Sequence, residues 1–94
     1  MSNVTITKAD LDDNGYYVKS SSLDVDGALT IEPGLGTVRF RGFVSAALSI
    51  NALAGSGIKA GSGIEAGTGI KAGSGIEAGT GIKAGWGIEA GSGI

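Results

Sequence analysis

Residues near the N-terminus carry oxygen ligands at a spacing that calcium-binding loops use. Asp10, Asp12, Asn14 and Gly15 correspond to positions 1, 3, 5 and 6 of such a loop. Position 12 would be Ser21, where calcium loops place a bidentate Glu, and no helix is predicted on either side. Two interpretations stay open, a partial metal site or a tight turn with solvated carboxylates. The missing Glu favours the turn.

Four basic residues in the first half of the chain could hold phosphate or nucleic acid. Nucleic-acid surfaces interleave basic with aromatic side chains, and phosphate sites place a Gly-rich loop before a helix. Neither pattern surrounds these cations, and six acidic residues share residues 1–53 with them. We therefore expect a solvated surface and no nucleic-acid partner. The four cations are Lys8, Lys19, Arg39 and Arg41.

The side chains most used in catalysis are absent from the sequence. The 94 residues include no His and no Cys, which removes the common general base, the thiolate nucleophile and the usual zinc ligands. The net charge of −2 does not indicate a polyanion-binding protein. No apolar run approaches the roughly 20 residues that cross a bilayer, and residues 1–13 lack the basic and apolar regions of a signal peptide. The sequence predicts a cytoplasmic protein without enzymatic activity or cofactor.

A strict six-residue repeat fills the C-terminal part of the chain. Residues six apart scatter around a helix but share one face of an extended strand. Glycines on both sides of each Ile-Lys-Ala or Ile-Glu-Ala segment oppose a helix and permit sharp bends. Each hexad is therefore predicted to form one short strand and one corner, with Ile and Ala inside and Lys or Glu outside. The repeated residues are Ile58, Ile64, Ile70, Ile76, Ile82, Ile88 and Ile94.

The charge after each Ile changes sign at every hexad, and this alternation predicts the number of sides in a coil. With two sides, residues twelve apart would stack, and Lys59 would lie on Lys71. With three sides, residues eighteen apart stack, and Lys59 meets Glu77. Because like charges on neighbouring strands are destabilising, the pattern favours three sides. The predicted neighbours are Lys59–Glu77, Glu65–Lys83 and Lys71–Glu89.

These patterns together predict an all-β fold, a triangular single-stranded parallel β-helix with about four coils of about 18 residues each. Residues 54–94 carry the strict repeat, and residues 23–53 show it in degenerate form. Residues 1–22 differ, because two short strands are predicted there around an Asp-Asn-Gly turn. We expect this segment to form a β cap, a hairpin that covers the N-terminal end of the solenoid.

The pattern of a small residue, Gly and Ile, as in Ser56-Gly57-Ile58, resembles the hexapeptide-repeat proteins. The resemblance covers residues 54–94 strictly and residues from Leu23 onward loosely, and it implies a left-handed parallel β-helix. Trp86 replaces the small residue and does not fit a narrow interior, so we expect a solvent-facing corner there, as for the Ser and Thr residues of the other hexads. The short coils are also similar to bactofilin-type solenoids, which are right-handed, and to short Gly-Ile-Glu-Ala-Gly repeat proteins of bacteria and mobile elements. A left-handed coil is favoured, and a right-handed coil stays possible.

Three functions stay open. The favoured hypothesis is a non-enzymatic structural scaffold that self-assembles, since the enzymes of the hexapeptide family use His and this chain has none. No capping residues follow the last hexad, so we expect a homo-oligomer, in its simplest form a dimer, through an interface of Trp86, Ile88 and Ile94. One alternative is a small phage or mobile-element protein that inhibits a macromolecular partner, for example a host defence complex. The other is a designed or truncated repeat protein.

Overall fold

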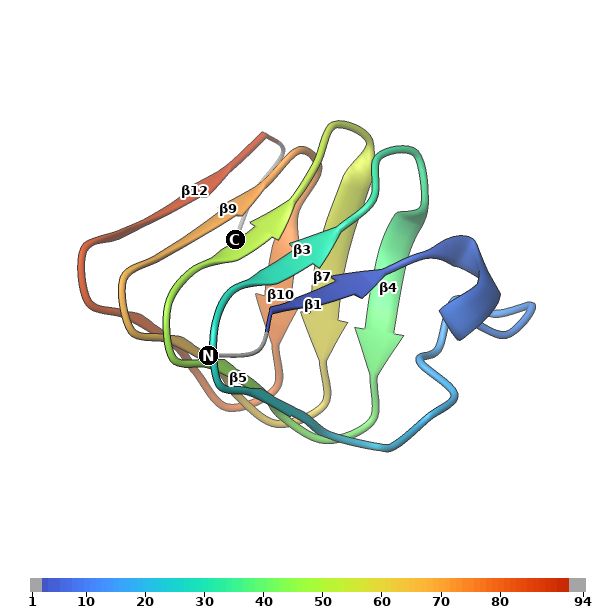
Figure 1. The fold of residues 1–94 in the computed structure, drawn as a ribbon, viewed down its shortest axis with the longest axis horizontal. Helices are drawn as coiled ribbons and strands as arrows, with labels where there is room; N and C mark the ends of the chain where they lie inside the picture. The colour runs from blue at the N-terminus through green and yellow to red at the C-terminus, as the bar shows by residue number, and fades with distance from the viewer. Residues whose placement is uncertain (1–2, 92–94) are drawn as a thin grey trace.

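The computed structural model describes residues 3–91, and Figure 1 shows that they form stacked β-coils. The strands are short, parallel and almost equal in length, and the only helix among the described residues is one 3₁₀ turn. The elements are β1 (Val4–Ile6), η1 (Lys8–Asp10), β2 (Leu23–Val25), β3 (Leu29–Ile31), β4 (Gly36–Phe40), β5 (Val44–Ala46), β6 (Ile50–Ala52), β7 (Ser56–Ala60), β8 (Ile64–Ala66), β9 (Gly69–Ala72), β10 (Ile76–Ala78), β11 (Ile82–Ala84) and β12 (Gly87–Ala90).

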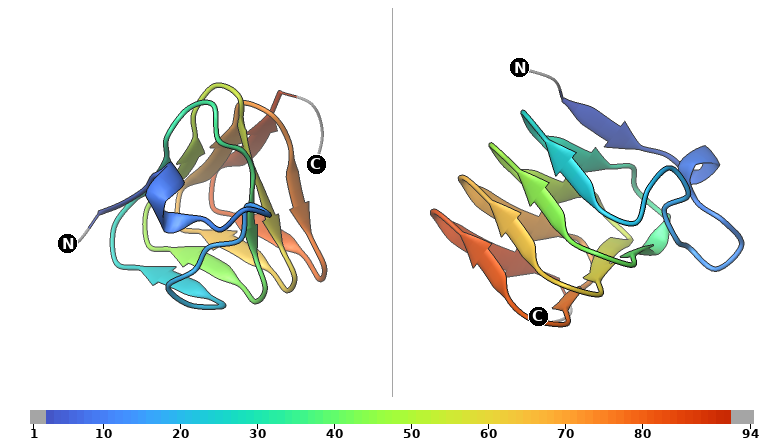
Figure 2. Two further views of the ribbon diagram at one scale, coloured as in Figure 1. Left: turned by 90° about the vertical axis from the view of Figure 1, so that its right-hand side faces the viewer. Right: turned by 90° about the horizontal axis from the view of Figure 1, so that it is seen from below.

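The strands form three sheets, and each coil contributes one strand to each sheet. The strand orders are β1-β3-β6-β9-β12, β4-β7-β10 and β2-β5-β8-β11. Figure 2 (right) shows the coils as successive layers, from the N-terminal strand at one end to β12 at the other. The prediction of a three-sided parallel β-solenoid is therefore confirmed. It has about three turns, and β11 and β12 begin the next one.

The length of a coil differs between the strict and the degenerate parts of the repeat. Ile64 lies beside Ile82, three hexads further on, as the repeat predicts. The step from Val44 to its neighbour Ile64 is two positions longer than three hexads, and the step from Leu23 to Val44 is three positions longer. The degenerate coils therefore keep the same three strands, and their additional residues lie in the corners.

The core is a set of apolar ladders that run along the solenoid axis. Val38 stacks on Ile58 and Ile58 on Ile76, while the Ala residues two positions after each Ile form a parallel ladder. As far as Ile76 these side chains are almost fully buried, whereas the charged residue between Ile and Ala points to solvent. The alternation follows from the two-residue period of a strand, which sends neighbouring side chains to opposite faces.

The first glycine of each corner is required by close packing between coils. A Cβ atom at Gly79 would lie 2.1 Å from the carbonyl oxygen of Gly61, which occupies the same corner one coil earlier. No glycine of residues 56–91 has a positive φ, so conformational freedom does not explain the repeat. A Cβ atom at Gly81, the second glycine of the same corner, would meet nothing within 4 Å. At Gly63, the second glycine one coil earlier, a Cβ atom would lie 3.3 Å from the carbonyl oxygen of Gly81, so the open space at Gly81 reflects its place in the last described coil.

The N-terminal segment joins the solenoid through β1. This strand pairs in parallel with β3, and Ile6 is fully buried at the end of the core. The Asp-Asn-Gly turn is present, closed by a single antiparallel bridge between Leu11 and Tyr17. Val4–Ile6 does not pair across this turn, and the second strand expected here forms only isolated bridges. Tyr17 packs against Phe40 with a ring-centroid distance of 5.4 Å, which attaches the segment to the core.

Candidate functional site

The C-terminal edge of the solenoid leaves the last strand of every sheet unpaired on one side within the described residues. Each of the three sheets ends in a strand that pairs on one side only, and these strands are β10, β11 and β12. The backbone N–H and C=O groups on their other side have no partner strand within residues 3–91. A sheet edge of this kind is a template for pairing with another chain.

Apolar side chains accompany this free edge. Ile82 and Ile88 are only partly buried, although Ile64 and Ile70, their neighbours one coil earlier, are 1% and 2% exposed. Ile82 and Ile88 are more exposed because they lie in the last described strands of their sheets, and no further described coil packs on them. Ala84 and Ala90 share this partial exposure. The edge therefore combines unpaired backbone with an incompletely covered end of the core.

Trp86 lies at the corner between β11 and β12, and the residue is 88% exposed. Its backbone N–H donates to the carbonyl of Thr68 in the preceding coil, which holds the corner in the stack. The prediction of a solvent-facing corner for Trp86 is confirmed. Ile88 lies in β12 beside Ile70, while Ile94, the third predicted interface residue, is outside the described residues.

The three predicted charge pairs occupy neighbouring positions on the outer faces. Glu77 lies beside Lys59, Lys83 beside Glu65, and Glu89 beside Lys71. One of these pairs forms an ion pair, with Lys59 Nζ 3.3 Å from Glu77 Oε2. The alternation of sign therefore identified the stacking step correctly.

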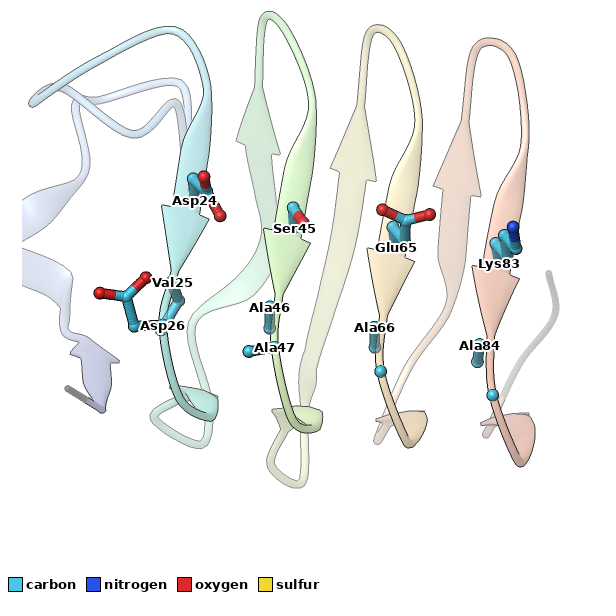
Figure 3. Close-up of a pocket in the computed structure, with 12 residues that line it drawn as sticks. Asp24, Val25, Asp26, Ser45, Ala46, Ala47, Glu65, Ala66, Lys83 and Ala84 are labelled. Carbon is cyan, nitrogen blue, oxygen red and sulfur yellow. The ribbon is translucent and has the colours of Figure 1, made fainter. Parts of the chain in front are cut away.

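The outer face of the sheet β2-β5-β8-β11 carries a row of polar side chains between two shallow grooves. Figure 3 shows Asp24, Ser45, Glu65 and Lys83 side by side on successive strands. Several alanine and glycine residues line one groove, and Phe43 lines the other. Two carboxylates and an amine on an open face can contact a polar partner, but no enclosed cavity is formed around them.

The carboxylates of the suspected calcium loop are already engaged. Asp10 accepts a hydrogen bond from the Thr7 N–H at 3.0 Å and forms an ion pair with Lys19 at 3.1 Å. Asp12 Oδ1 accepts from the N–H groups of Asn14 at 2.8 Å and Tyr16 at 2.9 Å. These contacts are typical of an Asx turn. In residues 3–91, no three His, Cys, Asp or Glu side chains come together as a metal site requires.

The same contacts lower the pKa of both carboxyls. The pKa of Asp10 is held below its ordinary value by the Thr7 N–H and then by Lys19. The pKa of Asp12 is lowered chiefly by the Tyr16 N–H, with a contribution from the positive charge of Arg41. Hydrogen bonds to the ionised form favour that form, so Asp12 stabilises the turn as an anion, and Asp10 as an anion holds Thr7 and Lys19.

Two of the four basic residues have a side-chain partner. Lys19 pairs with Asp10, and Arg41 stacks over the ring of Tyr16, with 4.2 Å from Cζ to the ring centroid. Arg39 lies beside Lys59, which places like charges on neighbouring strands. The contact between Arg41 and Tyr16 is a basic–aromatic pair that the sequence did not indicate, because the two positions lie far apart along the chain.

Ser56 is a buried polar residue that sequence analysis placed at an exposed corner. Its side chain is fully buried, its hydroxyl donates to the carbonyl of Glu32, and it accepts a hydrogen bond from the Leu35 N–H at 3.1 Å. Ser74, at the same place in the next coil, is only partly buried. The difference arises from the irregular corner at residues 32–36, which no feature of Ser56 itself indicates.

The described geometry defines a class of protein, the parallel β-solenoids. The chain matches no protein-family model, no curated protein and no solved structure. Among residues 3–91, no helix has the length and apolar character needed to cross a bilayer.

Proposed function

We propose that this chain is a non-enzymatic scaffold that works by self-association through the C-terminal edge of the solenoid. The observation that carries the proposal is the coincidence of three features at one place. These are three strands with a free edge, an incompletely covered core and an almost fully exposed Trp86. We also propose that the chain is related to the hexapeptide-repeat proteins. That relationship implies a left-handed coil.

The physical argument rests on the two ends of the stack. At the N-terminal end, β1 and the Tyr17 segment cover the core, so Ile6 and Leu29 are fully buried. At the opposite end, Ile82 and Ile88 remain partly exposed. A second copy that covers this edge would bury apolar surface and pair backbone groups together, and a two-fold dimer is the simplest closed assembly.

Sedimentation velocity across a wide range of protein concentration tests the proposal. We expect a concentration-dependent dimer, and a dimer at least about tenfold weaker for Trp86→Ser, since exposed tryptophans are frequent anchors of interfaces. Phe43→Ser is the matched control, because Phe43 is also an exposed aromatic residue but lies on an internal coil. A wild-type protein that stays monomeric at every concentration would contradict the proposal.

A second candidate function is inhibition of another macromolecule, and one observation favours it. The grooves beside the row of Asp24, Ser45 and Glu65 lie on a lateral face that end-to-end association leaves accessible. A partner would then bind along the stack and across several coils. Replacement of Asp24 and Glu65 by Ala would remove binding of such a partner without changing self-association, whereas Trp86→Ser would do the reverse.

A further inference from the structure

The segment from Ile82 to Ala90 is complementary to itself when it is read in opposite directions from Trp86. Each residue before Trp86 can be compared with the residue at the same distance after it. The two residues of a pair are opposite in charge, or one is large and the other small, and one pair consists of two glycines. Apolar residues oppose apolar residues, with Ile always facing Ala, and Lys faces Glu. The opposed pairs are Ile82 with Ala90, Lys83 with Glu89, Ala84 with Ile88 and Gly85 with Gly87.

We propose that two copies of this chain pair antiparallel about a two-fold axis through the Trp86 corner, with β11 of each copy beside β12 of the other. The inference rests on the proposed self-association and specifies its geometry. A two-fold axis perpendicular to the solenoid reverses the direction of the coil, so stacked strands of the two copies run antiparallel. The axis exchanges the two strands on either side of the corner. The interior-facing residues of β11 then meet those of β12, and Lys83 meets Glu89.

Charge complementarity decides against the arrangement in which β11 lies on the axis. In that dimer β11 would face itself, which opposes Lys83 to Lys83, and β10 would face β12, which opposes Glu77 to Glu89. Every facing pair would carry like charges, and directly opposed like charges are destabilising.

The remaining arrangement places the axis at the corner around Thr80, so that β10 of each copy faces β11 of the other. Glu77 would then meet Lys83, but β12 would face itself and oppose Glu89 to Glu89. Trp86 would also lie away from the axis. In the proposed dimer neither β11 nor β12 faces itself, and the charge of each Glu77 is balanced by Lys59 of its own copy at 3.3 Å. Only this arrangement brings the two exposed Trp86 side chains together.

The test reverses the charge of Lys83 in one variant and the charge of Glu89 in another. Lys83→Glu gives a copy with two acids at positions 83 and 89, and Glu89→Lys gives a copy with two bases. Each variant alone opposes like charges twice across the axis, so we expect it to dimerise roughly tenfold more weakly than the wild type. A mixture of the two variants opposes unlike charges twice, so we expect a heterodimer of near wild-type affinity.

Matched controls carry the same charge changes one coil earlier. Lys71→Glu and Glu65→Lys alter the neighbours of Glu89 and Lys83 within the chain but lie on β9 and β8, which are paired on both sides. We expect these variants to dimerise within about twofold of the wild type, with no gain on mixing. Unfolding curves of all four variants confirm that each remains folded.

The outcomes separate this geometry from self-association in general. Mutual rescue by Lys83→Glu and Glu89→Lys supports the two-fold axis at Trp86. A wild-type dimer without mutual rescue overturns this axis but leaves the proposed self-association standing. A wild-type monomer at all concentrations overturns both.

Discussion

Lys59 and Glu77 lie side by side on β7 and β10, one coil apart, with 3.3 Å between Nζ and Oε2. On its other side Lys59 lies beside Arg39 of β4. The row on this face therefore has two cations followed by one anion, and the anion balances the cation nearest to it. The alternation of sign is a property of the strict repeat, and it ends where the degenerate coils begin.

Glu77→Lys should destabilise the fold more than Lys59→Glu does. The first substitution leaves three cations in one row, whereas the second places an acid between Arg39 and Glu77, where one contact becomes favourable as the other becomes unfavourable. The side chains of Lys59 and Glu77 are 46% and 69% exposed, so we expect a loss of about 0.5–1 kcal/mol for Glu77→Lys and almost none for Lys59→Glu. Urea unfolding at low salt measures the difference.

High salt supplies the control for this pair of variants. Screening weakens interactions between exposed charges, so the loss for Glu77→Lys should shrink at about 1 M salt. A loss that is equal in both variants, or that does not respond to salt, would show that the row of charges does not set the stability of this face.

The strict repeat allowed most of the fold to be predicted from the sequence. The six-residue period of Ile sets the strand length, and the alternation of Lys and Glu sets the number of sides, so the sequence alone assigns Lys59 to Glu77. In the degenerate coils the same ladders exist, for instance Val44 beside Ile64, but the corners contain additional residues. Corner length has no periodic signal, because corner side chains point to solvent and tolerate many residue types.

Gly79→Ala should destabilise the protein, while Gly81→Ala should be neutral or slightly stabilising. The methyl group at Gly79 would overlap the carbonyl oxygen of Gly61, and backbone of an adjacent coil cannot move away without breaking the ladder. We expect a loss of about 1–3 kcal/mol there, as for other overpacked sites. At Gly81 nothing lies within 4 Å and φ is not positive, so Ala should add about 0.4–1 kcal/mol through the unfolded state.

The two glycine variants are compared by thermal and urea unfolding of otherwise identical chains. They lie in one corner and make the same chemical change, so each is the control for the other. Equal effects on stability would contradict the distinction between a glycine packed against the preceding coil and a glycine that no further described coil covers.

The turn at residues 12–15 should stay intact at moderately acidic pH and open only below the ordinary titration range of aspartate. The pKa values of Asp10 and Asp12 are lowered in the folded chain, so ionisation of both groups favours folding. This contribution is complete above the unfolded pKa and disappears as the pH falls through the lowered folded value. The Tyr16 amide signal in two-dimensional NMR spectra should therefore titrate with a midpoint below that of an unperturbed aspartate.

Substitution of the carboxylate identifies the group that titrates. Asp12→Ala removes the acceptor for the N–H groups of Asn14 and Tyr16, so the acid-dependent change of the Tyr16 signal should be lost. Asp10→Ala should leave the Tyr16 titration in place and remove that of the Thr7 amide. A midpoint at or above the ordinary value for aspartate would contradict the stabilising role of these anions.

The candidate site was partly predictable, and its limits have a physical cause. Trp86 was recognised because a large aromatic residue in a row of Ser and Thr contradicts the space inside a narrow coil. The contact of Arg41 with Tyr16 and the burial of Ser56 were not, because each depends on how an irregular segment packs against the regular stack. A repeat determines its own neighbours, but it does not determine how a non-repeating segment folds over it.

Ser56→Ala should destabilise the fold by about 1–3 kcal/mol, while Ser74→Ala should have little effect. The Ser56 hydroxyl is fully buried and joins the Glu32 carbonyl to the Leu35 N–H, so its removal leaves both backbone groups without this partner. Two hydrogen bonds with a net contribution of about 0.5–1.5 kcal/mol each account for this amount. Ser74 occupies the same position one coil later and is partly open to solvent, so it serves as the control.

Urea unfolding of both variants, with hydrogen exchange of the Leu35 amide as a local measure, tests the difference. If the two serines contribute equally to stability and the Leu35 amide keeps its protection in Ser56→Ala, then Ser56 does not anchor the irregular corner to the first strict coil.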